Sequence, residues 1–173
     1  ANYENMPAAD LVLITHDHGD HFDPAALEEV VKADTGVVAP AAVAAKYTRA
    51  APIEAGDTRE WNGWKIEAVH AYNLKGRHEK GVGVGYVLTF GGKRIYIAGD
   101  TDGTPEMKAL KDIDVAFVPM NPPYTMSPAE AAAAVRAFKP AVVYPYHFRG
   151  SDVKAFEAAL AGSGVEVRLR DWY

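Results

Sequence analysis

Short apolar runs alternate with segments of helical periodicity along most of the chain. Runs rich in β-branched and aromatic residues predict strands over residues 11–15, 36–39, 64–71, 82–90, 93–98, 114–118, 141–144 and 165–169. Helices are predicted over residues 24–32, 40–50 and 151–161, and a further helix begins after Ser127. Strands and helices in this mixed order, with both hairpins and crossovers, indicate a layered α/β domain.

Capping and turn residues support several of these boundaries. Asp23 precedes Pro24, and Ser127 is followed three residues later by Glu130, which is the pattern of a capping box. The pair Gly91-Gly92 joins strands 82–90 and 93–98 into a β-hairpin. We find no linker rich in glycine, proline or serine, so we expect a single domain over residues 1–173.

Charge and hydropathy limit the kinds of partner and the cell compartment that we expect for the protein. The formal net charge is −5 and no run of Lys or Arg is present, which argues against a nucleic-acid partner and does not bear on a small-molecule substrate. No apolar run reaches membrane-spanning length, so no membrane partner is expected. The sequence shows no signal peptide, which leaves a cytoplasmic protein, the default, and a mature periplasmic form as alternatives.

A dense group of metal-binding residue types directly follows the strand 11–15. The segment contains His16, Asp17, His18, Asp20 and His21. Neutral imidazoles and carboxylates are the ligands that a borderline divalent cation such as zinc prefers. A solvated polar loop would rarely contain three histidines and two aspartates in six positions, so the sequence predicts a metal site here.

The usual nucleophiles of covalent catalysis are missing from the sequence. The chain contains no cysteine, which also excludes disulfides and cysteine-ligated metal sites. None of the three serines, Ser127, Ser151 and Ser163, lies in a Gly-x-Ser-x-Gly elbow. Water activated by metal is therefore the nucleophile that we expect.

Three motifs together resemble the metallo-β-lactamase superfamily. His16-x-His18-x-Asp20-His21 is similar to its signature, and Gly99-Asp100-Thr101 and His147 follow predicted strands in the order that the family shows. The segment Pro122-Pro123-Tyr124-Thr125-Met126 resembles the branch that contains L-ascorbate-6-phosphate lactonase. The likeness extends from residue 9 to the C-terminus.

The resemblance implies a centre of two divalent metal ions, zinc by ligand type, with manganese as the alternative. The implied ligands are His16 and His18 for the first metal, Asp20, His21 and His147 for the second, and Asp100 as a bridge. Asp20 and Asp100 are also the implied catalytic residues. Asp17 is expected just outside the ligand set, where it would orient a ligand.

The third ligand of the first metal departs from the family pattern. Members usually carry Pro-Ala-x-His at the end of the strand that corresponds to 64–71, whereas this chain has His70-Ala71-Tyr72-Asn73. Asn73 therefore stands in the histidine position. His70 and His78 are the two candidates, and we favour His78 because the loop 75–85 contains glycines that would let it fold over the site.

The implied reaction is hydrolysis of an ester, lactone or phosphoester bond of a small substrate by a metal-bound bridging hydroxide. Alternatives are a phosphodiesterase or nuclease of the same fold and a non-catalytic metal-binding or sensor domain. Candidate substrate contacts are Tyr124, Thr125 and Arg149. The loop residues Lys75, Arg77 and Lys80 form either a solvated basic turn or an anion-binding site.

The resemblance also implies a fold class, a four-layer αββα sandwich of the metallo-β-lactamase type. Members usually have strands before the histidine cluster, whereas the cluster of this chain begins at residue 16. We therefore expect the sandwich to lack its usual N-terminal strands and to leave a strand edge exposed. A fragment, a processed form and a homo-oligomer are the three interpretations of this pattern.

Overall fold

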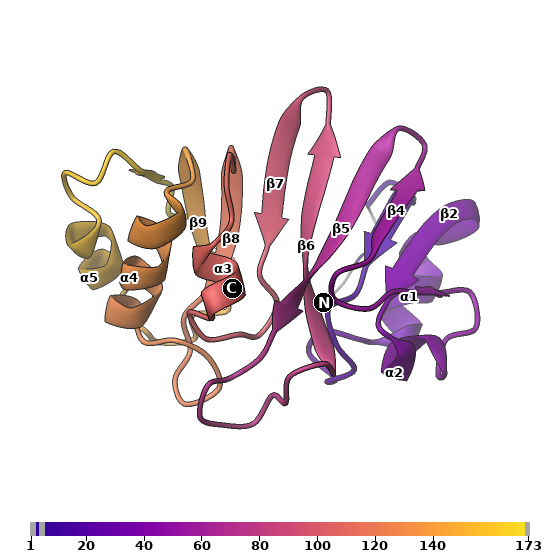
Figure 1. Cartoon of the computed structure of the whole chain (residues 1–173). Coiled ribbons are helices and arrows are strands. Elements are labelled where there is room, and N and C mark those ends of the chain that lie inside the picture. Colours follow the sequence, from indigo (N-terminus) through magenta and orange to yellow (C-terminus); the bar gives the residue numbers. More distant parts are fainter. Residues whose placement is uncertain (1–2, 4–5, 172–173) are drawn as a thin grey trace.

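Two β-sheets pack face to face between two groups of helices in the computed structural model, which describes residues 3 and 6–171 (Figure 1). The smaller sheet has the order β1-β2-β3 and consists of β1 (Ala9–Leu13), β2 (Val31–Ala39) and β3 (Ala51–Pro52), all parallel. The larger sheet has the order β10-β9-β8-β7-β6-β5-β4. Its strands are β4 (Thr58–Trp61), β5 (Trp64–Ala71), β6 (Gly83–Phe90), β7 (Lys93–Ile97), β8 (Val115–Pro119), β9 (Val142–Tyr146) and β10 (Glu166–Val167).

Three hydrophobic cores fill the spaces between the four layers. The helices α1 (Pro24–Val30) and α2 (Ala41–Ala44) cover the smaller sheet, and α3 (Pro105–Lys108), α4 (Pro128–Phe138) and α5 (Val153–Ala159) cover the larger one. A third core, which contains Ile53, Ile66 and Leu88, lies between the two sheets. The αββα sandwich is thereby confirmed.

One buried tyrosine joins the two sheets by hydrogen bonds as well as by packing. Tyr86 of β6 is fully buried, and its hydroxyl donates to the carbonyl oxygen of Ile14 at 2.7 Å. The carbonyl of Val38 lies 3.3 Å from the same hydroxyl. A buried hydroxyl needs such a partner, so this contact fixes the end of β1 relative to the larger sheet.

Most predicted boundaries agree with the structure to within two residues, and the predicted caps are present. Asp23 accepts hydrogen bonds from the first turn of α1, and Ser127 and Glu130 form the capping box of α4. Gly91 and Gly92 form the turn of the β6–β7 hairpin. The strand predicted over 36–39 begins earlier, at Val31, because α1 ends at Val30 and the chain becomes extended directly afterwards.

The helix predicted over residues 40–50 is wrong, because only Ala41–Ala44 is helical. The chain turns after α2 so that Tyr47 and Ala50 reach the core beneath the smaller sheet, and this packing outweighs the helix propensity of the alanines. The sequence interpretation also missed α3 and the short strands β3 and β4. The Asn62-Gly63 turn between β4 and β5 is a hairpin signal that could have identified β4.

The first strand lies at the edge of the smaller sheet, as expected. β1 pairs with β2, and no other strand of the part that the structure describes pairs with it. The outermost positions of the expected domain, residues 1–2, 4–5 and 172–173, lie outside the described residues. Within the described chain, every helix is too short or too polar to cross a bilayer.

Candidate metal centre

Strand ends from both sheets converge on one side of the sandwich. His16 follows β1, the loop 73–82 follows β5, Asp100 follows β7 and His147 follows β9. Because β5 and β7 are both antiparallel to β6, and β8 and β9 are parallel to β7, their carboxyl ends lie along the same edge. Ligands of layered α/β folds bind at such an edge.

Seven side chains at this edge form three overlapping groups that have the composition of metal sites. In each group the three ligand atoms lie within 4.8 Å of one another. The groups are His16, His18 and His78; His16, His21 and Asp100; and Asp20, His21 and His147. The first and third groups share no residue, and the second group shares one residue with each of them.

The carboxylate of Asp100 lies between the first and third groups. Its Oδ2 is 3.6 Å from Nε2 of His78. Its Oδ1 is 3.4 Å from Nε2 of His21 and 3.8 Å from Nε2 of His147. The two oxygens of one buried side chain therefore face different ligand groups.

Hydrogen bonds at the outer nitrogens orient the histidine rings toward the centre. Thr15 Oγ1 lies 3.0 Å from Nδ1 of His16 and 3.5 Å from Nδ1 of His21. Nδ1 of His78 lies 2.8 Å from Oδ1 of Asn73. Each contact leaves Nε2 of the ring facing the cluster, and partners of this kind keep metal ligands in place.

Burial keeps the inner histidines in the form that binds metal. Burial and the neighbouring imidazoles lower the pKa of His16 to about 3. Burial also lowers the pKa of His21 to about 4, although the carboxylate of Asp20 opposes this. Burial raises the pKa of Asp100 above its ordinary value, and the neighbouring His147 opposes that shift. His16 and His21 are therefore uncharged at neutral pH.

The cluster contains buried polar atoms that lack hydrogen-bond partners among the described residues. These atoms are Nε2 of His16, His21 and His78, Oδ1 of Asp100 and Nδ1 of His147. Buried polar groups without partners are costly, and native structures rarely leave several in one place. Divalent cations accept electron pairs from these atom types, so the residues present fit a metal centre.

The backbone at two of these positions departs from ordinary geometry. His147 has φ of 48°, in the left-handed region that residues other than glycine seldom occupy. Gly99, next to Asp100, has φ of 67°, and a Cβ there would lie 3.1 Å from both Thr15 Cβ and the carbonyl oxygen of Val84. Glycine adopts positive φ without strain, so the strained position is His147, and strain of this kind clusters at functional sites.

Two residues of the sequence analysis lie outside the ligand groups. His70 belongs to none of the three, whereas His78 belongs to the first. The side chain of His70 projects from β5 on the same side as Ile66 and Ala68, and its ring centre lies 6.3 Å from that of Tyr72. Asp17 is also outside the groups, and its Oδ2 accepts a hydrogen bond from Lys46 at 2.7 Å.

A cavity of about 660 Å³ opens over the cluster and has a basic rim. Arg77, Tyr124 and Arg149 line it together with Asn121. The Arg77 guanidinium lies over the Tyr124 ring, with Cζ 4.6 Å from the ring centre. Among the described residues, neither arginine contacts a carboxylate, so both charges are available at the cavity mouth.

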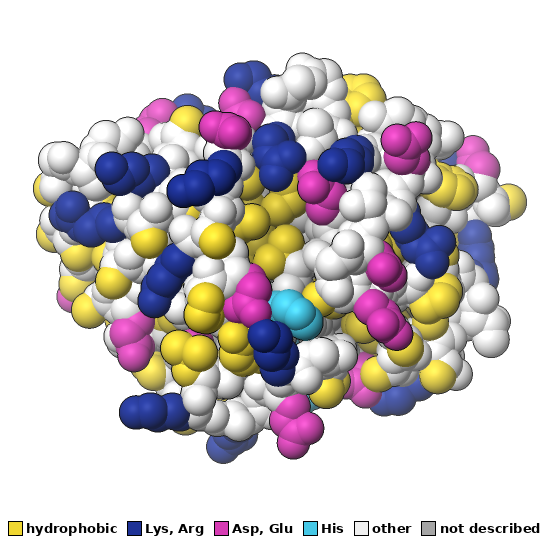
Figure 2. All heavy atoms as spheres, viewed as in Figure 1, with side chains coloured by type: hydrophobic (Ala, Val, Ile, Leu, Met, Phe, Trp, Pro, Cys, Tyr) yellow, Lys and Arg dark blue, Asp and Glu magenta, His cyan; other side chains and the backbone are white. Residues whose placement is uncertain are grey.

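Two other residues that were considered as ligand contacts, Lys80 and Thr125, have structural partners. Lys80 donates to Glu106 Oε1 at 2.6 Å, which ties the loop 73–82 to α3. Thr125 was expected to contact substrate, but this is wrong: it is buried and its hydroxyl accepts a hydrogen bond from the backbone of Asn121 at 2.7 Å. Figure 2 shows Lys and Arg side chains interspersed with Asp and Glu on the face drawn, and no continuous basic stripe.

Comparison with known proteins places this geometry in a family. Residues 1–148 match the model of the beta-lactamase superfamily domain. The chain is 33% identical over 171 residues to a UPF0173 metal-dependent hydrolase of Thermus thermophilus, covering 91% of this chain and 76% of that protein. A UPF0173 metal-dependent hydrolase of Thermococcus onnurineus is 37% identical over 176 residues, covering 92% and 77% of the two chains.

Solved structures agree with the sequence comparison. The crystal structure of a Parabacteroides distasonis protein, described as a metal-dependent hydrolase, has a TM-score of 0.95 and 46% identity, covering 98% of this chain and 80% of that one. The metallo hydrolase Igni18 of Ignicoccus hospitalis has a TM-score of 0.79 and 27% identity, covering 94% and 76%. The finer likeness to the L-ascorbate-6-phosphate lactonase branch stays a prediction. The family match and the similar hydrolases together show that the protein belongs to the metallo-β-lactamase superfamily and is a metal-dependent hydrolase.

Proposed function

We propose that the protein hydrolyses an ester, lactone or phosphoester bond of a small anionic substrate at a centre of two divalent metal ions. The observation that carries this proposal is the position of Asp100, whose two oxygens face His78 on one side and His21 and His147 on the other. Zinc is the metal that the five imidazoles favour, with manganese as the alternative.

The proposed ligand set divides the cluster into two halves. His16, His18 and His78 hold the first ion, Asp20, His21 and His147 hold the second, and Asp100 bridges them. Divalent ions bound there would supply Lewis acidity toward the scissile oxygen and a water molecule of lowered pKa. His70 is not part of this proposed set.

The remaining chemistry falls to the chain's own residues. Asp20 has a half-exposed carboxylate whose Oδ2 lies 3.2 Å from Nε2 of His147, so it faces the cavity as well as the cluster. In this position it can accept a proton from a water molecule and orient it toward the substrate. The unpaired guanidiniums of Arg77 and Arg149 favour a substrate that carries a carboxylate or phosphate group.

Metal analysis and a substrate panel test the proposal together. Protein purified without chelators or a histidine tag is expected to contain two equivalents of zinc or manganese per chain. It is then assayed with lactones, carboxylic esters and phosphodiesters, each as a neutral and an anionic version. Turnover of an anionic compound supports the proposal.

Two outcomes would contradict it. Protein that binds no metal even after reconstitution would show that the cluster is not a metal centre. Protein that binds two ions but hydrolyses no member of the panel would favour the non-catalytic sensor alternative. A comparison of Asp20→Ala with His70→Ala then assigns the activity, because only the first substitution should abolish it.

A further inference from the structure

We propose that Asn73 is a positioning residue that fixes the ring orientation and the tautomer of His78, so that a loop histidine serves as a ligand where the strand itself provides none. The inference rests on the proposed role of His78 in the metal centre. Asn73 lies two residues beyond the end of β5, at the start of the loop 73–82 that carries His78.

Both ends of the Asn73 side-chain amide are occupied. Its Oδ1 accepts from the backbone N–H groups of Arg77 at 3.2 Å and His78 at 3.0 Å, and it lies 2.8 Å from Nδ1 of His78. Its Nδ2 donates to Asp102 Oδ1 and to the carbonyl oxygen of Tyr124, both at 3.1 Å. A side chain whose five polar contacts reach three separate segments of the chain is rigidly held.

These contacts leave only one orientation for the amide. Backbone N–H groups can only donate, so the oxygen must face Arg77 and His78. A backbone carbonyl can only accept, so the NH₂ group must face Tyr124. The orientation of Asn73 is therefore determined by main-chain groups, independently of how the histidine is protonated.

The tautomer of His78 follows from this orientation. An amide oxygen cannot donate, so Nδ1 of His78 must carry the proton in the 2.8 Å contact. In the neutral ring Nε2 then has a free electron pair. That atom is buried, lies 3.6 Å from Asp100 Oδ2 and makes no hydrogen bond within the described residues. Asn73 thus presents a nitrogen in the form that binds metal.

The same residue closes the loop and anchors it to the rest of the site. The backbone N–H of Asn73 donates to the carbonyl oxygen of His78 at 2.9 Å, so residues 73–78 form a ring closed by main chain and side chain together. Asp102 accepts from Asn73 through Oδ1 and from the N–H of Leu74 at 2.8 Å through Oδ2. Asp102 follows β7 by only a few residues, so the loop is fastened to the segment that carries Asp100.

The experiment compares Asn73→Ala, Asn73→Asp and a matched control, Leu74→Ala. Leu74 is an exposed neighbour in the same loop, and its hydrogen bond to Asp102 uses its backbone N–H, which alanine retains. Long-range proton–nitrogen NMR of metal-free protein with ¹⁵N-labelled histidine reads the tautomer of each ring. Competition with a chelator measures the zinc affinity of each variant.

The wild type and Leu74→Ala are expected to show His78 protonated at Nδ1. Asn73→Ala should show a mixture of tautomers and a zinc affinity at the first site lowered about 10- to 100-fold, the usual effect of losing a partner behind a ligand. Asn73→Asp keeps a side-chain oxygen that accepts from Nδ1 of His78, so it should restore the Nδ1–H tautomer. This holds even though the variant protein is less stable, because it loses the NH₂ donors and places a second carboxylate beside Asp102. A residue that supports only the loop's shape would not give this rescue.

The proposal is overturned if Asn73→Ala keeps the Nδ1–H tautomer and binds zinc within twofold of the wild type. It is also overturned if Asn73→Asp gives the same tautomer mixture as Asn73→Ala. The His78→Ala variant separates these failures from failure of the proposed function. If His78→Ala binds two equivalents of zinc as tightly as the wild type, the ligand role is wrong, whatever tautomer Asn73 enforces.

Discussion

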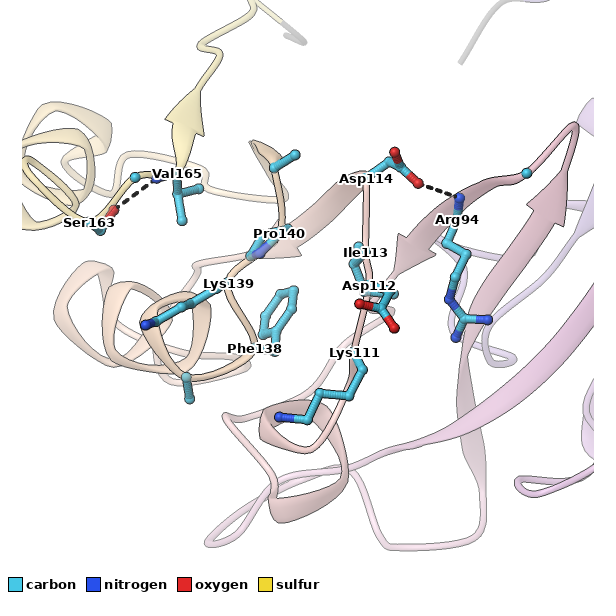
Figure 3. Close-up of a pocket in the computed structure, with 14 residues that line it drawn as sticks. Arg94, Lys111, Asp112, Ile113, Asp114, Phe138, Lys139, Pro140, Ser163 and Val165 are labelled. Carbon is cyan, nitrogen blue, oxygen red and sulfur yellow. Dashed lines mark hydrogen bonds between the residues drawn. The ribbon is translucent and has the colours of Figure 1, made fainter.

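Two hollows of similar volume lie at opposite ends of the larger sheet, and they differ in the state of their polar groups. The metal centre opens into a cavity of about 660 Å³ at the carboxyl ends of β7, β8 and β9. A hollow of about 650 Å³ lies at the amino ends of the same strands, between Arg94, Asp114, Lys139 and Val165 (Figure 3).

Two charged residues that line the hollow at the amino ends, Arg94 and Asp114, form ion pairs. Asp114 accepts from Lys93 at 2.7 Å and from the backbone of Arg94 at 2.9 Å, and Arg94 pairs with Glu67 at 3.2 Å. At the carboxyl ends, three buried imidazole nitrogens and a carboxylate oxygen face one another without hydrogen bonds among the described residues. The size of a hollow therefore does not identify a site, whereas converging unpaired ligand atoms do.

The largest expected effect comes from removing the central carboxylate. Asp100→Asn preserves the shape but loses the charge and one of the two oxygens that face the ligand groups, so metal content should fall below that of the wild type. Turnover should fall by more than the roughly 100-fold that loss of an outer partner typically causes. Metal analysis and steady-state kinetics measure both, with the exposed Lys111→Ala of the opposite hollow as control. If Asp100→Asn keeps the full metal content, the unpaired carboxylate is not needed for metal binding, and it no longer distinguishes the metal centre from the opposite hollow.

The metal-free protein should lose stability in mild acid. The unfolded chain takes up protons on His16 and His21 near pH 6.5, whereas the folded chain does so only near pH 3 and pH 4. Stability therefore decreases as the pH falls from 7 to 5, by about 1–3 kcal/mol. Asp100, whose pKa is raised by burial, opposes part of this loss because its proton binds more readily in the folded state.

Urea unfolding midpoints of chelator-treated protein at pH 7 and pH 5 measure this change. The Lys93→Ala variant should show the same pH dependence, because its substitution lies at the other end of the sheet. A midpoint that does not move between the two pH values would contradict the burial of neutral histidines in the cluster.

Alanine substitutions at two glycines test whether the larger sheet is packed more tightly at its carboxyl end than at its amino end. Gly99 beside Asp100 and Gly92 beside the opposite hollow both have positive φ, but only a Cβ at Gly99 would meet other atoms, at 3.1 Å. Each alanine substitution should cost roughly 1–2 kcal/mol for the left-handed backbone. Gly99→Ala should cost about 1 kcal/mol more for crowding. If urea unfolding gives the same loss of unfolding free energy for Gly99→Ala and Gly92→Ala, the chain beside the metal centre is no more tightly packed than the chain beside the opposite hollow.

The smallest effect is expected from the ion pair at the opposite hollow. Lys93 is largely exposed, so Lys93→Ala should change the free energy of unfolding by less than about 1 kcal/mol. Metal content and turnover should remain at wild-type values. A loss of metal in this variant would mean that the two ends of the sheet are coupled.

The sequence predicted those parts of the molecule that depend on short-range patterns. The cluster from His16 to His21 stood out because its ligand types are adjacent in the chain, whereas Asp100 and His147 were expected as ligands only because of the resemblance to the metallo-β-lactamase superfamily. The hairpin at Gly91-Gly92 and the cap at Ser127 were equally local signals.

Features that depend on tertiary contacts could not be predicted from the sequence. Strand alternation placed His70 on a definite face, but only the folded loop shows that His78 and not His70 joins the cluster. The contact between Thr15 and His16 and the pairing of Lys80 with Glu106 likewise needed the fold. The end of α2 was mispredicted because Tyr47 packs beneath the smaller sheet, a contact that no local pattern encodes.

The contact of Tyr86 with Ile14 has a consequence for how metal preference could be tuned. His16 and His21 follow the smaller sheet, and His78, Asp100 and His147 follow strands of the larger one, so each ligand group draws on both sheets and its internal spacing is set where the sheets meet. Interior residues such as Ile66 and Leu88 act there as spacers, although they lie away from any ligand. Changing their volume would shift the ligands of one sheet against those of the other, so selectivity among ions of different radius becomes a property of the protein's apolar interior.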